Sequence, residues 1–595
     1  MPAFVGLALM LLNPAGLVAV ELPQGYMSEK ESRQILAKTL TLRLDPDLSP
    51  LSEAERKAVP VLLEVGQIFQ ELYEITRHYQ ARSAHAELLR LDEELGHPQA
   101  TRDLIDLYRL FKGPVARTLD NKLVPFLPVE ERVPGKNVYP WDVEKDEIEQ
   151  FLENYPEEES QILHVRTVVR RSDPLRINGD LSTLENHPIL DLLHPGLKER
   201  LVALREEPSR RAFYAVPYSV AFSEYLMGAY YLLNKAAALL ESDDQDFSRF
   251  LRHRAVDLLR DDYEAGDAAW VTGSFGNLNA EIGSYETYDD QLYGVKSFFA
   301  LSLVVKDPMM SSTVETVKTW LQEMEDILPY EPHKTVRGDI PIGAYNVVAD
   351  FGQARGTNTA TILPNESYIT RKYGRTILLR NNILTNKNIF EVRRTAFNAA
   401  VSEQYHNDYD PKGDFFRTLW HEIGHYLGPD LTEDGRTLDV ALEEDVSILE
   451  ELKADLIALY VSKRLRKKGY YDKPRLRAVQ ASGIRRVLQK NQPKKSQVYR
   501  TMQLMQMNYY LEKGLLEYDG QKNKLVIHHD QYHPVVESML REVLALQQSG
   551  DKGAADEFIA KYSTWEESPH ERVATSMKEA ENYRYGLVRY GALGE

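Results

Sequence analysis

His421-Glu422-Ile423-Gly424-His425 is the stretch of this chain that decides its fold, because it follows the pattern H-E-x-x-H. On a helix this spacing sets two imidazoles one turn apart on the same face, with a carboxylate beside them. Two such imidazoles can share one Zn²⁺ ion, which leaves the glutamate free to polarise a metal-bound water molecule. The stretch therefore predicts a zinc hydrolase whose metal is held by a helix.

The residues around the motif also favour a short, buried helix. Apolar side chains precede and follow it at helical spacing, and Gly428-Pro429 then ends the helix, because glycine relaxes the backbone and proline cannot continue the ladder. The alternative is an ordinary core helix with one buried and one exposed histidine. A charged Glu422 set between two histidines in an apolar helix would then be costly.

A second motif, Glu450-Glu451-Leu452-Lys453-Ala454-Asp455, follows 25 residues after His425. Apolar residues from Ile448 to Tyr460 recur at three- and four-residue intervals, which predicts another helix. We expect Glu451 to be the third zinc ligand, with Glu450 and Asp455 accepting N–H bonds from the ligating imidazoles. The alternative is a solvated acidic face. The two motifs together describe a gluzincin, most simply a peptidase.

These residues resemble a known family. Glu450 to Asp455 is similar to the E-E-[CLA]-[RK]-A-[DE] motif of dipeptidyl peptidase III. The short H-E-x-x-H followed by Gly and Pro resembles a plant and bacterial branch of that family, which includes plant proteins fused to a Nudix domain. Ile282 to Asp290 and Leu363 to Glu366 resemble two further family segments, so the likeness covers about residues 210 to 565.

The resemblance implies specific roles for the residues of the two motifs. His421, His425 and Glu451 would be the ligands of one Zn²⁺ ion per chain, and Glu422 would be the general base. The native metal among Zn²⁺, Co²⁺ and Mn²⁺ stays open.

The resemblance also implies a substrate site outside the metal motifs. Tyr285 would hydrogen-bond the scissile carbonyl or the developing oxyanion. Asn365 would hold the backbone of the bound peptide, with Glu286 near its amino end. Without the resemblance, Tyr285 would be one of 34 ordinary tyrosines.

One position departs from the family pattern. Where the family has a histidine that stabilises the transition state, this chain has Tyr499, next to Arg500. A phenol and a guanidinium can each donate a hydrogen bond to an oxyanion, but neither is an imidazolium. We therefore expect Tyr499 as a catalytic donor and Arg500 as a substrate-binding residue, with catalytic efficiency open.

The implied function is zinc-dependent hydrolysis of short peptides, with release of N-terminal dipeptides by Glu-assisted attack of zinc-bound water. Two alternatives stay open. The chain could be a catalytically weak or inactive zinc-containing peptide-binding protein, or a metallohydrolase that acts on a non-peptide amide.

Composition limits the partners. The chain has 72 basic and 90 acidic residues, a net charge of −18, which argues against nucleic acid or an anionic membrane as a partner. The absence of cysteine excludes disulfides and thiolate zinc sites. We expect a monomer that acts on short peptides.

The first 20 residues suggest a signal peptide. Phe4 to Leu12 is an apolar run that is too short for a membrane span but suits a signal-peptide core, although no basic segment precedes it. We expect export to the periplasm or secretion, with no membrane insertion after signal removal. The alternative is a cytoplasmic protein with a buried first element.

The residue patterns predict an α+β chain that is predominantly helical, and the resemblance implies two lobes around a wide cleft, with zinc on the helical lobe. Residues 21–300 would form the N-terminal α+β lobe, to which 340–385 return. Residues 301–339 and 386–595 would form the mainly helical zinc-binding lobe.

Two segments test this expectation in detail. The pattern predicts a helix over Tyr293–Lys306. In the family, a carboxyl-terminal segment of the chain returns to the first lobe. Here that segment would be either missing or reduced to Asn582–Gly594.

Overall fold

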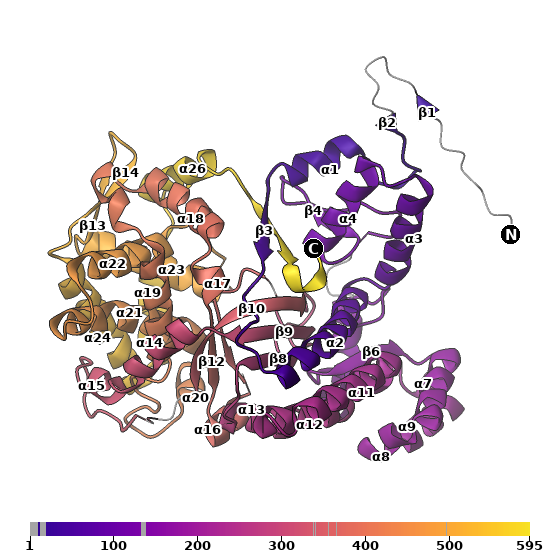
Figure 1. Ribbon diagram of the computed structural model, residues 1–595. Coiled ribbons are helices and arrows are strands. Elements are labelled where there is room, and N and C mark those ends of the chain that lie inside the picture. Colours follow the sequence, from indigo (N-terminus) through magenta and orange to yellow (C-terminus); the bar gives the residue numbers. More distant parts are fainter. Residues whose placement is uncertain are drawn as a thin grey trace.

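The chain is mainly helical, with one five-stranded sheet near its centre (Figure 1). The computed structural model describes residues 10–11, 19–131, 138–336, 338, 341–354, 356–364, 366–494 and 497–595. The expected signal peptide lies outside the described residues, apart from the paired strands β1 (Met10–Leu11) and β2 (Ala19–Val20). Among the described residues, no helix is both long and apolar enough to cross a bilayer.

The central sheet has the strand order β11-β12-β10-β9-β8. β12 is parallel to β10, and the other neighbouring strands are antiparallel. β11 therefore lies at one edge of the sheet. The strands are β8 (Leu278–Ser284), β9 (Phe299–Lys306), β10 (Ile342–Gly352), β11 (Ala360–Leu363) and β12 (Thr376–Arg380).

The expected helix over Tyr293–Lys306 is wrong, because Phe299–Lys306 is strand β9. The seven residues from Phe299 to Val305 are all buried. A continuous apolar run of this length suits a central strand covered on both faces as well as it suits a buried helix, and periodicity cannot separate the two.

The first hydrophobic core contains buried residues of β8, β9 and β10 and of most helices of the amino-terminal half, whereas α1, α3 and α4 pack in a separate, smaller cluster. Helix α2 crosses β9 and β10, and Gly66 of α2 lies against the ring of Phe351, where a Cβ atom would come within 2.3 Å of a ring carbon. The helices of this half are α1 (Glu29–Leu36), α2 (Glu53–Arg77), α3 (Ala81–Glu94), α4 (Gln99–Phe111), α5 (Lys145–Asn154), α6 (Glu159–Ile162), α7 (Pro174–Asn186), α8 (Pro188–Leu193), α9 (Leu197–Glu206), α10 (Tyr218–Ala221), α11 (Ser223–Leu240), α12 (Gln245–Arg260) and α13 (Glu264–Thr272).

A second hydrophobic core lies among the helices that follow the sheet. Strand β12 separates the two cores, since Leu378 packs in the first while Ile377 and Leu379 pack in the second. The helices that follow β9 along the chain are α14 (Pro308–Lys318), α15 (Leu321–Glu325), α16 (Ser367–Tyr373), α17 (Asn381–Leu384), α18 (Lys387–Ala400), α19 (Pro411–Gly424), α20 (Leu438–Leu442), α21 (Val446–Lys467), α22 (Lys473–Val487), α23 (Val498–Glu512), α24 (Tyr532–Ser549), α25 (Lys552–Tyr562) and α26 (Arg572–Glu579). Of these, α16 contacts α13 of the first half, and its Tyr373 packs against the first core.

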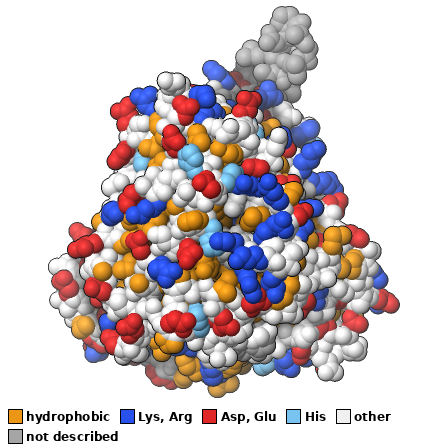
Figure 2. Space-filling view, turned by 90° about the vertical axis from the view of Figure 1, so that its left-hand side faces the viewer, with side chains coloured by type: hydrophobic (Ala, Val, Ile, Leu, Met, Phe, Trp, Pro, Cys, Tyr) orange, Lys and Arg blue, Asp and Glu red, His pale blue; other side chains and the backbone are white. Residues whose placement is uncertain are grey.

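The chain returns to the first half at its end. Strand β15 (Tyr585–Tyr590) pairs in parallel with β3 (Thr39–Leu44), and Tyr590 packs in the first core. This segment lies within the expected return over Asn582–Gly594. The outer face of the helical part carries basic and acidic side chains side by side (Figure 2).

The domain boundaries stay a proposal. Strand β9 packs in the first core, although most of it lies beyond the proposed boundary at residue 300. Helices α14 and α15 pack in the second core, which is where residues 301–339 were expected to lie. Residues 340–385 contribute to both cores through β10 and β12.

Candidate metal centre

Helix α19 carries the H-E-x-x-H motif. It begins after Asp410, whose side chain accepts a hydrogen bond from the backbone of Lys412, and it ends at Gly424 with His425 as its C-cap. Gly428 then has a φ of +84°, a left-handed conformation that suits glycine and turns the chain away from the helix. His421 and Glu422 are both buried.

Gly424 lets α19 and α21 come together at the metal motifs. A Cβ atom at this position would lie 2.9 Å from Cα and 3.0 Å from the carbonyl oxygen of Ala454 on α21. These are rigid backbone atoms, so a larger residue would push the two helices apart. The glycine inside H-E-I-G-H thus sets the distance between the histidines and the second motif.

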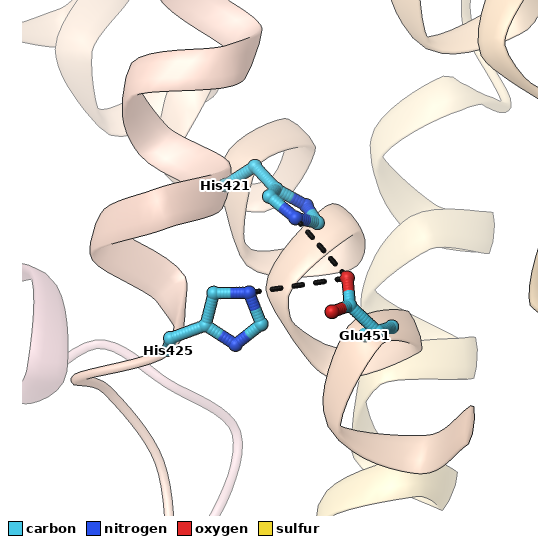
Figure 3. Close-up of side chains that lie close together, drawn as sticks. All are labelled: His421, His425 and Glu451. Carbon is cyan, nitrogen blue, oxygen red and sulfur yellow. Dashed lines mark ion pairs between the residues drawn. The ribbon is translucent and has the colours of Figure 1, made fainter. Parts of the chain in front are cut away.

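The two imidazoles and Glu451 converge (Figure 3). Nε2 of His421 lies 3.3 Å, and Nε2 of His425 lies 3.9 Å, from Oε2 of Glu451. One ligand atom from each of the three residues lies within 4.8 Å of the others. Two nitrogens and one carboxylate oxygen around a common point are the ligand set of a catalytic zinc site.

Each histidine is oriented by a second carboxylate. Nδ1 of His421 lies 2.6 Å from Oδ1 of Asp455, and Nδ1 of His425 lies 3.1 Å from Oε1 of Glu450. When Nδ1 donates its proton to a carboxylate, Nε2 is left with a free lone pair for a metal. Glu450 accepts a hydrogen bond from His425, and Asp455 lies beside His421 as an ion-pair partner; the orienting role of both carboxylates stays a prediction.

These carboxylates are in turn held by basic and amide side chains that sequence reasoning largely missed. Arg417 and Arg486 contact the two oxygens of Asp455 at 3.0 and 3.2 Å, and Lys453 contacts Glu450 at 2.9 Å. Gln506 and Gln547 donate to Asp455 and Glu450. Only Lys453 lies inside a motif, and it was noticed there as a countercharge. The others come from α19, α22, α23 and α24, and no spacing rule links them.

The electrostatics of the group fit a bound cation. Burial disfavours the charge on His421, yet the Asp455 and Glu451 carboxylates outweigh it and raise the pKa of His421 to about 9. The pKa of Glu451 is lowered despite its burial, because both imidazoles lie beside it. Oε2 of Glu451 is buried and accepts no hydrogen bond among the described residues. A divalent cation would take the place of the proton that the His421 imidazole otherwise holds.

Tyr499 lies beside this group. The residue is 54% exposed, but partial desolvation of the phenol and the nearby carboxylate of Glu451 raise its pKa. Glu422 acts in the same direction, and Arg486 opposes them. Its phenol is therefore protonated and able to donate a hydrogen bond at neutral pH. Arg500, the next residue of α23, is exposed, and the described residues show no contact between it and the metal motifs.

The other predicted substrate residues lie in the first half of the chain. The Tyr285 hydroxyl donates to Asp267 at 2.6 Å, and Asp267 also pairs with the buried Arg254. Tyr285 has no described contact with His421 or with Glu451. Glu286 follows it, and its charge acts on Glu281. Asn365 lies outside the described residues.

The fold of this chain is shared with solved structures of dipeptidyl peptidases III. The structure of this enzyme from Caldithrix abyssi matches with a TM-score of 0.75 and 23% identity, over 94% of this chain and 99% of that one. The dipeptidyl peptidase III from Corallococcus sp. strain EGB matches with a TM-score of 0.73 and 24% identity, over 96% of this chain and 98% of that one.

The sequence resemblance to this family is thus confirmed at the level of the fold. Among curated proteins, Nudix hydrolase 3 of Arabidopsis thaliana is 26% identical over 563 residues, which cover 88% of this chain and 69% of that protein. No family model matches the chain.

Proposed function

We propose that this chain is a zinc-dependent metallopeptidase of the dipeptidyl peptidase III family that releases dipeptides from the amino ends of short peptides. One observation carries the proposal. On a fold shared with dipeptidyl peptidases III, Nε2 of His421, Nε2 of His425 and Glu451 converge, while both Nδ1 atoms face carboxylates.

The residues of the site divide the chemistry between them. Zn²⁺ bound by His421, His425 and Glu451 would supply Lewis acidity, which activates water and polarises a peptide carbonyl. Glu422 follows the first ligand directly and would accept the proton of the attacking water, then deliver it to the leaving amine. Tyr499 would donate a hydrogen bond to the oxyanion.

Strand β11 is our candidate for the surface that holds the peptide. It is an edge strand, since among the described residues it pairs with β12 alone. Helix α19 contacts both strands, and the Tyr426 hydroxyl donates to the carbonyl of Arg375, just before β12, at 2.6 Å. An extended peptide added to this edge would run beside the metal helix. Asn365 directly follows the Leu363-Pro364 end of β11, where the predicted contacts of Asn365 and Glu286 with the peptide would be made.

The position of Tyr285 bears on its proposed role as a donor to the scissile carbonyl. Its hydroxyl is engaged by Asp267. In this arrangement the proposed role requires the first half of the chain to approach the metal helices when a peptide is bound. The wide cleft between the lobes, with zinc on the helical lobe, is part of the same proposal.

The experiment described below also distinguishes three other functions from the proposed one. A weak or inactive zinc-containing peptide-binding protein would hold zinc without turnover. A metallohydrolase of another amide would cleave amides that are not peptides. The name of the Arabidopsis relative denotes a different hydrolase, so a nucleoside diphosphate derivative belongs in the substrate panel.

The test is hydrolysis by the purified protein of dipeptidyl arylamides, blocked arylamides and ADP-ribose, with zinc measured on the same sample. We expect cleavage of dipeptidyl arylamides only. Glu422→Gln should retain zinc and lose roughly 10²–10⁴-fold in rate, as removal of a general base does. Retained zinc with no peptide cleavage would favour a binding protein, and cleavage of only another substrate would replace the proposal.

Export and a monomeric state complete the proposal. Cell fractionation would place the chain in the periplasm or medium, or else in the cytoplasm. Sedimentation of the purified protein should give the mass of one chain, which is 68.2 kDa before signal removal.

A further inference from the structure

A cavity lies at the end of α19 that is remote from the metal motif. Its volume is about 760 Å³, within the range of about 300–1,000 Å³ that is typical of small-molecule sites. The cavity is bounded by the short helix η3 (Glu403–Asp408), by the first turns of α19 and α22, and by His529. Helix α19 is 14 residues long, so its two ends are about 20 Å apart. The described residues that line the cavity are all different from those of the candidate metal centre.

The cations of this cavity lack ionic partners. They are Lys412, Lys473, Arg475 and Arg477. Among the described residues, no carboxylate forms an ion pair with any of these four side chains. The chain has 90 acidic and 72 basic residues, so carboxylates are abundant enough to pair with them, yet none does.

Two carboxylates of the cavity are engaged by backbone groups. Asp410 is the N-cap of α19 and accepts a hydrogen bond from the backbone of Lys412. Asp472 caps α22 in the same way and accepts a hydrogen bond from the backbone of Arg475. These carboxylates compensate the partial positive charges at the starts of the two helices, and they leave the side-chain cations without a counterion.

The third carboxylate of the cavity lies beside a histidine. Oδ2 of Asp408 is 3.3 Å from Nε2 of His529. Burial and the charge of Arg477 lower the pKa of His529, so the imidazole is largely neutral at pH 7. The side chains of the lining therefore carry four positive and three negative charges, in a chain whose net charge is −18.

The two arginines are fixed by contacts that leave donors unused. Nη1 of Arg475 donates to the carbonyl of Tyr470 at 3.0 Å, and its guanidinium lies over the ring of Phe416 at 4.9 Å. Nη1 of Arg477 donates to Gln480 at 3.3 Å. Each guanidinium has five N–H groups, so most of its donors remain for a ligand. A guanidinium that is already held in one orientation loses less entropy when it binds an anion.

The wall that carries these side chains is rigid. Helices α19 and α22 lie side by side in the helical half of the molecule (Figure 1). A Cβ atom at Gly413 would lie 2.2 Å from the carbonyl oxygen of Ala478, so the two helix backbones are in direct contact next to the cavity. Lys412 of α19 and Lys473 of α22 are exposed. They can therefore approach a ligand from two different helices.

We propose that this cavity binds a small polyphosphate anion. Lys412 and Lys473 would neutralise its charge, and Arg475 and Arg477 would donate hydrogen bonds to its oxygens. A guanidinium matches phosphate oxygens with paired donors, and an ammonium supplies a compact charge. A single carboxylate, such as the end of a peptide, carries too little charge to satisfy four cations. Pyrophosphate and the diphosphate group of a nucleotide share the chemistry that the cavity requires.

The test is calorimetric titration of the purified, zinc-loaded protein with pyrophosphate. We expect saturable binding at one site per chain. Lys412→Gln combined with Lys473→Gln should weaken this binding by roughly tenfold or more, because charged hydrogen-bond donors are lost.

Lys30→Gln combined with Lys235→Gln is the matched control. Both lysines are exposed, have no described ion pair and lie outside the cavity lining, and their replacement changes the net charge by the same amount. The control should bind pyrophosphate within about twofold of the wild type, because exposed charges away from the cavity are screened by salt.

Titration with ADP identifies the source of the anion. A lower Kd for ADP than for pyrophosphate would support a nucleotide as the ligand, and a lower Kd for pyrophosphate would support the free anion. Absence of saturable binding of both anions would overturn the proposal. So would equal pyrophosphate affinities of the wild type and the Lys412→Gln, Lys473→Gln variant, since the anion would then bind elsewhere, for example at the metal. Because no peptide is present, these results do not depend on peptidase activity.

Discussion

At the scale of the residue, we expect the carboxylates behind the imidazoles to strengthen metal binding. Glu450 is held between His425 and Lys453. We expect Glu450→Gln to weaken zinc binding by about 10–100-fold, because a neutral amide orients and polarises the imidazole less well. Competition with a chromophoric chelator measures this, and Glu537→Gln on α24, whose carboxylate contacts His533 and Arg541, is the control. An unchanged zinc affinity in Glu450→Gln would show that Glu450 does not contribute to metal binding.

The metal-free site also predicts a pH dependence. The pKa of His421 is raised from its ordinary 6.5 to about 9. A group whose pKa rises on folding stabilises the fold fully below the ordinary pKa, and the contribution is lost as pH rises through the folded pKa. A difference of this size is worth about 3 kcal/mol.

Chelated protein should therefore lose stability between pH 7 and pH 10, whereas zinc-loaded protein should change little, since the metal replaces the proton. Urea denaturation at several pH values, with and without chelator, measures both curves. If the unfolding free energies of chelated and zinc-loaded protein changed with pH in the same way, His421 would not have a raised pKa in the metal-free fold.

At the scale of the element, the approach of α19 to α21 depends on Gly424. Gly424→Ala would bring a methyl group within 3.0 Å of the Ala454 backbone. We expect a loss of about 1–3 kcal/mol in unfolding free energy from this overpacking, together with weaker zinc binding. Gly179→Ala is the matched control, because Gly179 is an exposed residue of α7 with open space around its Cα. It should stabilise slightly. An unchanged unfolding free energy and zinc affinity in Gly424→Ala would mean that α19 and α21 can accommodate an added methyl group.

The elements also show what the sequence could and could not predict. Both metal helices were predictable, because a metal motif fixes the spacing of ligands within one helix. Strand β9 was mistaken for a helix, because a continuous run of buried apolar residues shows neither the helical nor the strand periodicity of hydrophobic residues. Arg486 was missed because it reaches Asp455 only through the packing of α22 against its neighbours. Tyr499 was found through the family pattern alone, and its catalytic role stays a prediction.

At the scale of the whole molecule, the carboxyl-terminal strand ties the end of the helical half to the first core. β15 pairs with β3 over six residues, and Arg589 contacts Asp106 at 2.6 Å. Removal of residues 583–595 should cost roughly 2 kcal/mol or more, mainly through lost strand hydrogen bonds. Limited proteolysis should then cut first near Thr39–Leu44, while zinc binding persists. Unchanged stability and protection would show that the strand is dispensable.

The central claim, a peptidase whose activity depends on one metal at His421, His425 and Glu451, is tested most directly by restoring zinc to chelated protein. The rate of dipeptidyl-arylamide hydrolysis is followed as zinc is added, with Glu451→Gln beside the wild type. The account predicts that wild-type activity rises linearly and saturates at one zinc per chain, while the variant does not recover. Activity that survives complete removal of zinc, or a chain that binds none, would contradict it.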